Sequence, residues 1–309
     1  MDLSIVIPAY NEKENIVELY KRLSAVLKQL KKTYEIIFVD DGSSDGTFVE
    51  LDKISKTDKN VKVIKFRKNF GQTAAWSAGF DSSKGDLIIT MDSDLQNDPK
   101  DIPKLLKKIS EGYDVVSGWR HKRKDKFFKK FFSLFSRFLR KKLIKDQIHD
   151  SGCSLKVYKK EAIKELELHG EMHRYIVELL ALKGYKIGEV KVKHYPRLKG
   201  KTKYNLIRLP KGFLDLILVA FWQRYSARPL HLFGGIGLLS TFFGVLIGIY
   251  LVYIKFKFGV AIANRPLLLL CVLFIVLGVQ FIIFGIITDI LTKIYYSDKK
   301  NYSIEKILR

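Results

Sequence analysis

Two aspartates, Asp92 and Asp94, stand one residue apart in the stretch MDSDLQND, at the end of the apolar run DLIITM. A short apolar run bounded by polar residues is typical of a buried strand. Side chains two residues apart on a strand point to the same side, so both carboxylates face one way. Together with water and phosphate oxygens, two carboxylates can bind Mg²⁺ or Mn²⁺, and Gln96 offers a third protein oxygen. The spacing therefore predicts a divalent metal site at the end of this strand.

The same stretch allows a simpler interpretation, in which its acids serve the next helix. Pro99 is a typical first helical residue after a cap, and Asp98 and Asp101 suit the first turn of a helix. Asp92 and Asp94 precede that cap, so this explanation does not cover them. We expect Asp98 to serve the helix and the two earlier aspartates to serve a metal.

Polar residues also follow the apolar runs LSIVIP and EIIFVD. Asp40 and Asp41, in DDGSSDGT, can accept hydrogen bonds from the base or ribose of a nucleotide. In PAYNE, Tyr10 can stack on a base and Glu12 can bond a ribose, or Asn11 simply caps a helix. Neither stretch matches the glycine-rich dinucleotide fingerprint or the phosphate-binding Gly-Lys-Ser/Thr loop. If a nucleotide binds here, a metal rather than backbone amides must hold its diphosphate.

Alternating strands and helices over residues 1–118 would bring these side chains together. Such alternation predicts a parallel sheet with helices on both faces, and ligands bind beyond the carboxyl ends of its strands. Further along, SLKVY and EVKVK indicate strands and MHRYIVELLALKG a helix. The expected strands are 3–8, 35–40, 61–66, 86–91 and 114–118, and the expected helices are about 12–31, one after GSSDGT, one through QTAAWSAGFDSS, and about 99–111.

Two long apolar runs, 230–254 and 266–290, predict a hairpin of two transmembrane helices. Each can cross a hydrocarbon core of about 30 Å as a helix. Residues 205–229 are amphipathic and predict an interfacial helix leading into the pair. Positive charge is concentrated in the first 229 residues and in the tail, 291–309, which predicts that both lie on the cytoplasmic side. No signal peptide is evident, and two cysteines indicate no disulfide framework.

The formal net charge of +23 at pH 7 raises the question of nucleic-acid binding. Much of the excess lies between Arg120 and Lys145, where phenylalanines recur at spacings of three and four residues. This pattern predicts a basic amphipathic helix, 127–145, lying on an anionic membrane surface, with a core helix bearing a solvated basic face as the alternative. We therefore expect no nucleic-acid partner. A homo-oligomer is compatible with the sequence.

Four stretches, IVIPAYNEKENI, VDDGSSDGT, DSDLQNDP and GWR, resemble family 2 glycosyltransferases with the GT-A fold, an α/β architecture with a Rossmann-like, mostly parallel sheet. The resemblance extends through HDSGC, GEMHRYI and RLKGKTKY. With the terminal hairpin, it is strongest to the membrane-bound polyprenyl-phosphate enzymes, such as dolichyl-phosphate mannose synthases and two-span undecaprenyl-phosphate glucosyltransferases. It implies a cytoplasmic catalytic domain over residues 1–204.

The implied activity is a metal-dependent, inverting transfer of a sugar from a nucleotide-sugar to a polyprenyl phosphate, either undecaprenyl or dolichyl. UDP-glucose or a UDP-N-acetylhexosamine is the favoured donor, with GDP-mannose as an alternative. Asp150, in HDSGC, would position the sugar or acceptor, or else form a turn. By resemblance, the metal ligands are Asp92, Asp94 and Gln96, and the residues that act in catalysis are Asp94, Asp150 and Arg120. The acceptor phosphate would be bound by Arg120, Lys129 and Ser133. The nucleotide-sugar pocket would be lined by Pro8, Tyr10, Glu12, Asp40, Asp41, Asp92, Ser93, Asp94, Arg197 and Lys203.

Two rival functions fit parts of the sequence. A processive polysaccharide synthase would share the Asp-x-Asp pair, but it would carry a Gln-x-x-Arg-Trp motif and more spans than two. A membrane-tethered module could bind nucleotide-sugars or lipid without turnover. The presence of both metal carboxylates and of Arg120 favours an enzyme.

Overall fold

The structure is a computed structural model that describes residues 1–120, 148–166, 168, 170, 172–196, 221, 225, 228–259, 261–262 and 266–296. The chain divides into two compact units, Met1–Val219 and Ala220–Arg309. The predicted basic helix 127–145 and most of the predicted interfacial segment 205–229 lie outside the described residues.

The first unit is built on a seven-stranded sheet in the order β3-β2-β1-β4-β6-β5-β7. All neighbouring strands are parallel except β6, which runs antiparallel to both β4 and β5. The mostly parallel sheet implied by the family resemblance is therefore confirmed, whereas the alternating pattern predicted parallel strands only and did not place β6. The strands are β1 (Leu3–Ala9), β2 (Tyr34–Asp40), β3 (Val61–Lys65), β4 (Leu87–Thr90), β5 (Val115–Arg120), β6 (Lys156–Lys159) and β7 (Ile187–Val192).

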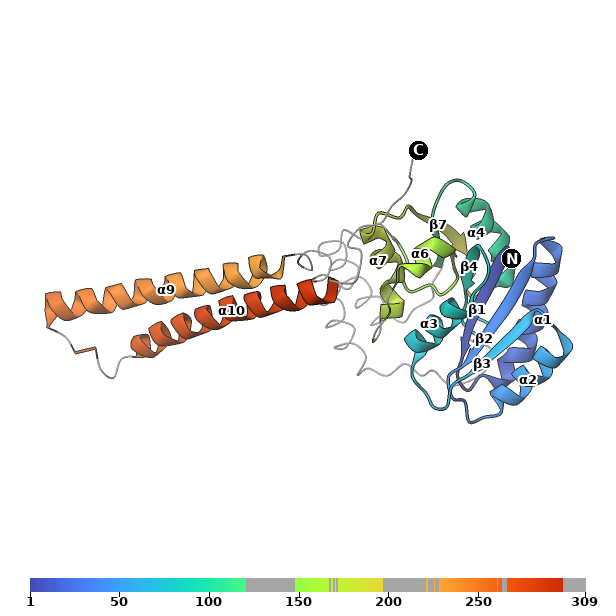
Figure 1. Ribbon diagram of the computed structural model, residues 1–309, viewed down its shortest axis with the longest axis horizontal. Coiled ribbons are helices and arrows are strands. Elements are labelled where there is room, and N and C mark those ends of the chain that lie inside the picture. The colour runs from blue at the N-terminus through green and yellow to red at the C-terminus, as the bar shows by residue number, and fades with distance from the viewer. Residues whose placement is uncertain are drawn as a thin grey trace. The chain divides into compact units, whose positions relative to one another are not determined.

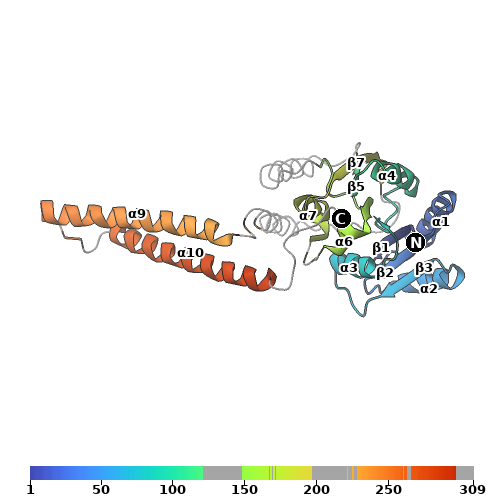
Figure 2. The same ribbon diagram turned by 45° about the horizontal axis from the view of Figure 1, so that its top comes forward.

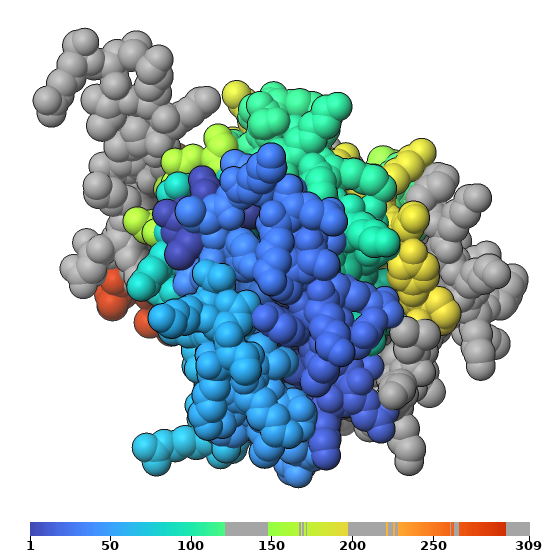
Figure 3. All heavy atoms as spheres, turned by 90° about the vertical axis from the view of Figure 1, so that its right-hand side faces the viewer, coloured from blue at the N-terminus to red at the C-terminus, as the bar shows by residue number. Residues whose placement is uncertain are grey.

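Helices cover both faces of this sheet (Figure 1). Successive strand residues point to opposite sides, and those on both sides are apolar, so each face needs a covering layer. On one face, Leu3, Ile5 and Ile7 pack with α1 (Lys13–Gln29), α2 (Thr47–Thr57) and α4 (Ile102–Ile109). Figure 3 shows the outer surface of this layer in blue and green. On the other face, Val6 and Ile88 pack with α3 (Gln72–Ser82), α6 (Lys160–Lys164) and α7 (Ile176–Leu182). The short helices η1 (Pro99–Asp101) and η2 (Met172–Tyr175) precede α4 and α7.

The apolar stripe of α1 illustrates how sequence periodicity fixes this packing. Ile16, Leu19, Leu23 and Leu27 recur at spacings of three and four residues and are fully buried. That spacing places them on one helical face. Burying a side chain of this kind stabilises the fold by about 1.5–3 kcal/mol.

Strand register brings the carboxyl ends of β1, β2 and β4 to one edge of the sheet. Ala9 is paired with Asp40, and Val6 is paired with Thr90. The segments that follow, beginning at Tyr10, Asp41 and Met91, therefore leave the sheet side by side. The expected meeting of polar strand ends is confirmed.

The second unit contains two long helices, α9 (Pro229–Phe258) and α10 (Pro266–Tyr296), which lie side by side (Figures 1 and 2). Both are long and apolar enough to cross a membrane, with mean hydropathies of 2.1 and 3.1. They extend beyond the predicted spans, and α10 continues into the segment predicted as a tail. Small residues allow close contact, because a Cβ on Gly237 would lie 2.6 Å from the Gly278 carbonyl oxygen.

Candidate active site

Asp92 and Asp94 lie just beyond β4, in a turn that Leu95 closes with a positive φ of 61°. Asp94 is buried and Asp92 is half-buried. The side-chain amide of Gln72 donates to Asp92 Oδ1 at 2.9 Å, and the Gln96 backbone N–H donates to Asp94 Oδ1 at 3.1 Å. Burial and the negative charge of Asp94 raise the pKa of Asp92 to about 6, against a hydrogen bond from Ser154. Two like charges in a poorly solvated turn favour binding of a cation.

The residues that follow this turn separate into two roles. Asp98 caps η1 by accepting a hydrogen bond from the Lys100 backbone N–H at 3.0 Å, so its predicted helix-capping role is confirmed. The Gln96 carbonyl accepts from the Tyr195 N–H at 2.9 Å, and the Gln96 side-chain amide donates to the Tyr195 carbonyl at 3.4 Å. Gln96 therefore ties the turn to the segment after β7 through its backbone and amide nitrogen, and among the described residues its side-chain oxygen is left as a candidate ligand.

Asp40 and Asp41, at the end of β2, are both buried but have different surroundings. Asp41 accepts hydrogen bonds from the backbone N–H groups of Phe70, at 2.7 Å, and Gly71, at 3.0 Å. Burial raises the pKa of Asp41, these hydrogen bonds oppose the rise, and Asp40 adds to it. Asp40 Oδ1 accepts from the Ser43 N–H at 3.2 Å, whereas its Oδ2 is buried with no hydrogen-bond partner among the described residues.

The PAYNE turn after β1 is held to the segment after β2. Asn11 has a positive φ of 53°, its N–H donates to Ser43 Oγ, and its side-chain oxygen accepts from the Ser44 N–H. The cap position of α1 is Glu12 rather than Asn11, and Glu12 accepts from the Asn15 side chain at 2.6 Å. Pro8 and Tyr10 flank the same edge of the sheet. The turn thus places the predicted nucleotide residues of β1 and β2 next to each other.

Arg120, the last residue of β5, forms a two-pronged ion pair with Asp150. Its Nε lies 2.6 Å from Asp150 Oδ2, and its Nη2 lies 2.8 Å from Oδ1. The side chains of Arg120 and Asp150 are only 12% and 11% exposed. Burial alone would lower the pKa of Arg120, but the hydrogen bonds and charge of Asp150 outweigh it and raise that pKa above its usual value. A Cβ on Gly152 would lie 3.0 Å from Nη2, so this glycine makes room for the guanidinium.

A carboxylate on β7, Glu189, holds the segment that carries Asp150. Glu189 Oε1 accepts from the backbone N–H groups of His149, at 2.8 Å, and Asp150, at 3.3 Å. Glu189 Oε2 lies 2.7 Å from His149 Nδ1, and the His149 ring stacks on Trp119 at 4.4 Å. These contacts agree with a structural role for His149, and they hold the backbone of Asp150 in place through Glu189.

The loop between β3 and α3, together with the first two residues of α3, was missed in the sequence as part of the site. Phe70 and Gly71 bond Asp41, Gln72 bonds Asp92, and the Thr73 hydroxyl lies 2.7 Å from His173 Nδ1. One short segment therefore joins the ends of β2 and β4 to η2. The signal was available, because this loop follows the carboxyl end of the third predicted strand, like the other polar clusters.

Most of the predicted site residues thus gather at one edge of the sheet. Ser93 is buried between the two aspartates of the metal motif. In the part of the chain that the structure describes, no three His, Cys, Asp or Glu side chains form a metal cluster. Two carboxylates and an amide nonetheless suit Mg²⁺ or Mn²⁺, which commonly keep water and phosphate ligands. Four predicted residues lie outside the described residues: Lys129, Ser133, Arg197 and Lys203.

Comparisons with known proteins assign the chain to a family. The model of glycosyl transferase family 2 matches residues 4–167, which includes both aspartates, Arg120 and Asp150. The chain is a family 2 glycosyltransferase. It is 39% identical to the dodecaprenyl-phosphate galacturonate synthase of Rhizobium johnstonii, over 99% of this chain and 93% of that protein. It is 33% identical to the undecaprenyl-phosphate 4-deoxy-4-formamido-L-arabinose transferase of Proteus mirabilis, over 99% and 94%.

Solved structures confirm the GT-A fold of this glycosyltransferase. The glucosyl-3-phosphoglycerate synthase of Mycobacterium tuberculosis in complex with UDP has a TM-score of 0.57, at 18% identity over 72% of this chain and 79% of that one. The same synthase with Mn²⁺ and UDP-glucose has a TM-score of 0.56, at 18% identity over 71% and 78%. The predicted family, fold and enzyme class are confirmed.

Proposed function

We propose that this glycosyltransferase moves a sugar from a nucleotide-sugar to a polyprenyl phosphate at a membrane surface. The observation that carries the proposal is the match to a polyprenyl-phosphate enzyme along 99% of the chain, from the β1 strand to the end of the helical hairpin. The hairpin would keep the catalytic unit close to a lipid acceptor. The excess of Lys and Arg in the first unit favours its placement on the cytoplasmic side.

Asp92 and Asp94 would hold the divalent ion, with Gln96 beside them. The raised pKa of Asp92 supports this assignment, because burial and the negative charge of Asp94 disfavour its ionised form and a cation would offset both effects. When bound, the ion would neutralise the diphosphate of the donor. Asp40 Oδ2 lacks a partner among the described residues, so it is the acceptor best placed to bond an N–H of the nucleotide base. Asp41 would act indirectly, by holding the loop at Phe70 and Gly71.

Arg120 would receive the phosphate of the lipid, and Asp150 would fix the position of its guanidinium. Both Asp150 oxygens already accept hydrogen bonds from Arg120, so this carboxylate is poorly suited to act as a free general base. None is needed, because a lipid phosphate is already ionised near neutral pH. One of its oxygens would attack the anomeric carbon while the bond to the nucleoside diphosphate breaks. A single displacement of this kind inverts the configuration at that carbon.

UDP-glucose and UDP-N-acetylhexosamine remain the favoured donors from the sequence, and the names of the relatives add galacturonate and 4-deoxy-4-formamido-L-arabinose to the candidate sugars. The deciding experiment incubates the purified chain with undecaprenyl or dolichyl phosphate, Mg²⁺ or Mn²⁺, and a panel of UDP- and GDP-sugars. Mass spectrometry of the lipid then identifies the product.

Two aspartates of the same motif provide the matched control. Asp94→Ala should abolish product formation, whereas Asp98→Ala should keep most of it, because the Asp98 side chain caps η1 and accepts a hydrogen bond from the Tyr195 hydroxyl at 3.4 Å, so it serves local structure rather than the metal. Nucleotide-sugar binding without any lipid product in the wild type, across the whole panel, would refute the proposal and favour a binding module.

A further inference from the structure

Gln280 is the one polar interruption that α10 presents to its surroundings in the middle of the helix. It is exposed, and its amide has no hydrogen-bond partner among the described residues. Two hydroxyl groups of the hairpin are instead satisfied within it: the Ser240 hydroxyl donates to the Phe274 carbonyl, and the Thr288 hydroxyl to the Phe284 carbonyl, each at 2.7 Å. Gln280 is therefore an exposed amide for which the described part of this chain offers no partner.

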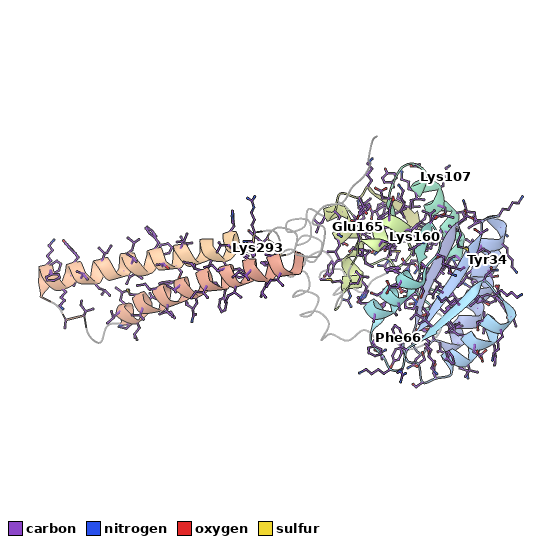
Figure 4. All side chains as sticks on the ribbon, viewed as in Figure 1. Tyr34, Phe66, Lys107, Lys160, Glu165 and Lys293 are labelled. Carbon is purple, nitrogen blue, oxygen red and sulfur yellow. The ribbon has the colours of Figure 1, made fainter. Side chains whose placement is uncertain are left out.

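The neighbouring helix α9 cannot supply that partner, because Gln280 lies on the opposite face of α10. The face toward α9 is marked by Cys271 and Gly278, both buried, and by Gly285, where a Cβ would meet Leu230 at 2.9 Å. Gln280 follows Gly278 by two residues, which is about 200° round an α-helix. Side chains project from this outer face along the whole helix (Figure 4).

The exposed face around Gln280 carries a seven-residue repeat. Its members alternate at spacings of four and three residues, which is the spacing of a seam between two packed helices. Apart from Gln280 they are all Leu, Val or Ile and all exposed. In chain order the seam is Leu269, Leu273, Val276, Gln280, Ile283, Ile287, Ile290 and Ile294.

An amide on this seam would be costly if it faced only lipid. Gln280 lies 14 residues after Pro266, where α10 begins, and 9 before Asp289, the first charged residue of α10, so roughly 21 Å and 14 Å of helix separate it from these two positions. Its side chain is too short to reach either end. Hydrocarbon offers no hydrogen bond, and glutamine in a membrane helix is usually paired with a polar group of another helix.

We propose that α10 is a dimerisation helix, in which the Gln280 seam packs against the same seam of a second copy of this chain. The inference rests on the membrane placement in the proposed function. Two copies inserted with the same orientation have parallel α10 helices, so their Gln280 residues lie at the same depth. An amide is both donor and acceptor, so two of them can bond each other across a two-fold axis. The apolar seam on either side would pack in register around this pair.

Disulfide crosslinking in membranes tests the seam directly. Val276→Cys and Ile287→Cys, on the seam, should crosslink to covalent dimers on oxidation. Leu270→Cys and Ile286→Cys, exposed positions about a quarter of a turn to either side, should not. Wild type provides the blank, since both of its cysteines are buried. Adding Gln280→Leu to the seam variants should weaken association about 3- to 30-fold, while leucine preserves insertion of the helix.

Three results would overturn the inference: equal crosslinking at all four positions, crosslinking of the seam cysteines only to a different protein, or reaction of those cysteines with a water-soluble maleimide. The readout is independent of catalysis. A monomeric chain that still makes the lipid product would refute dimerisation and keep the proposed function. A dimer crosslinked through the seam that transfers no sugar would support dimerisation and refute the proposed function.

Discussion

The Arg120–Asp150 ion pair, which is largely shielded from solvent, should contribute more to the stability of the fold than an exposed ion pair does. Asp150→Asn keeps the shape of the side chain but removes its charge and one of its two acceptor oxygens. In the wild type that carboxylate accepts from Arg120 Nε, Nη2 and backbone N–H. The amide nitrogen introduced by the substitution would instead face a guanidinium N–H, so two donors would oppose each other. Arg120, whose side chain is only 12% exposed, would then lose one or two of its three hydrogen bonds to residue 150.

The expected cost follows from the burial of the pair. Breaking a buried ion pair by removing one partner costs about 3–5 kcal/mol. The remaining amide oxygen recovers about 1 kcal/mol as a hydrogen bond. We therefore expect Asp150→Asn to lower the free energy of unfolding of the first unit by about 2–4 kcal/mol. The matched control is Asp52→Asn, because Asp52 pairs with Lys56 at 2.6 Å but both side chains are exposed, by 42% and 72%. That change should cost about 0.5 kcal/mol or less.

Urea unfolding of the detergent-solubilised chain, followed by tryptophan fluorescence, measures both values. The decrease in the free energy of unfolding for the double variant Arg120→Gln/Asp150→Asn should be smaller than the summed decreases of the two single variants by about 1 kcal/mol or more, because the two side chains interact directly. Steady-state kinetics should show that Asp150→Asn raises KM for the lipid phosphate more than KM for the nucleotide-sugar. Equal destabilisation by Asp150→Asn and Asp52→Asn would refute the reasoning, as would additive single variants.

Three further predictions concern the metal motif and the hairpin. Because burial and Asp94 raise the pKa of Asp92 to about 6, folding of the metal-free protein binds protons, so its thermal stability should fall as the pH rises from about 4 to about 6. Over the same pH interval the affinity for Mn²⁺, measured by paramagnetic resonance, should rise as the competing proton leaves Asp92. An Asp92→Asn variant that still showed the fall in stability or the rise in Mn²⁺ affinity would contradict the assignment of these effects to Asp92. Gln72→Leu, which removes the amide bonded to Asp92, should weaken Mn²⁺ binding about 10- to 100-fold, and an unchanged affinity would count against it. Gly237→Ala should lower the melting temperature of the detergent-solubilised chain because its Cβ would meet α10 at 2.6 Å, whereas Gly235→Ala, with nothing within 4 Å, should not; similar losses would refute the close packing.

Local periodicity was sufficient to predict most of the fold. The strands β1 to β5 and their helices follow from alternating apolar runs and amphipathic stripes, because burial of one face is decided within a few residues. The placement of β6 was not predictable in this way. Lys156–Lys159 inserts antiparallel between β4 and β5, which are consecutive in the first alternating series. Only the pairing of distant strands decides that insertion, and no local pattern records it.

For the site, the sequence by itself determined which residue types stand at the strand ends. Asp92 and Asp94 were identified because they follow an apolar run, although they lie in a turn beyond β4, where the two-residue repeat of a strand no longer orients them. Asp98 was separated from them because a helix cap has its own local pattern. The tertiary structure decided the partners: Asp150 on Arg120, Glu189 behind Asp150, and Gln72 on Asp92. These bonds join residues 20 to 39 positions apart, and they depend on which strands become neighbours and on how their ends align. The sequence gives the chemical groups of the site, but the contacts that set their orientation and their pKa values form only when the sheet has assembled.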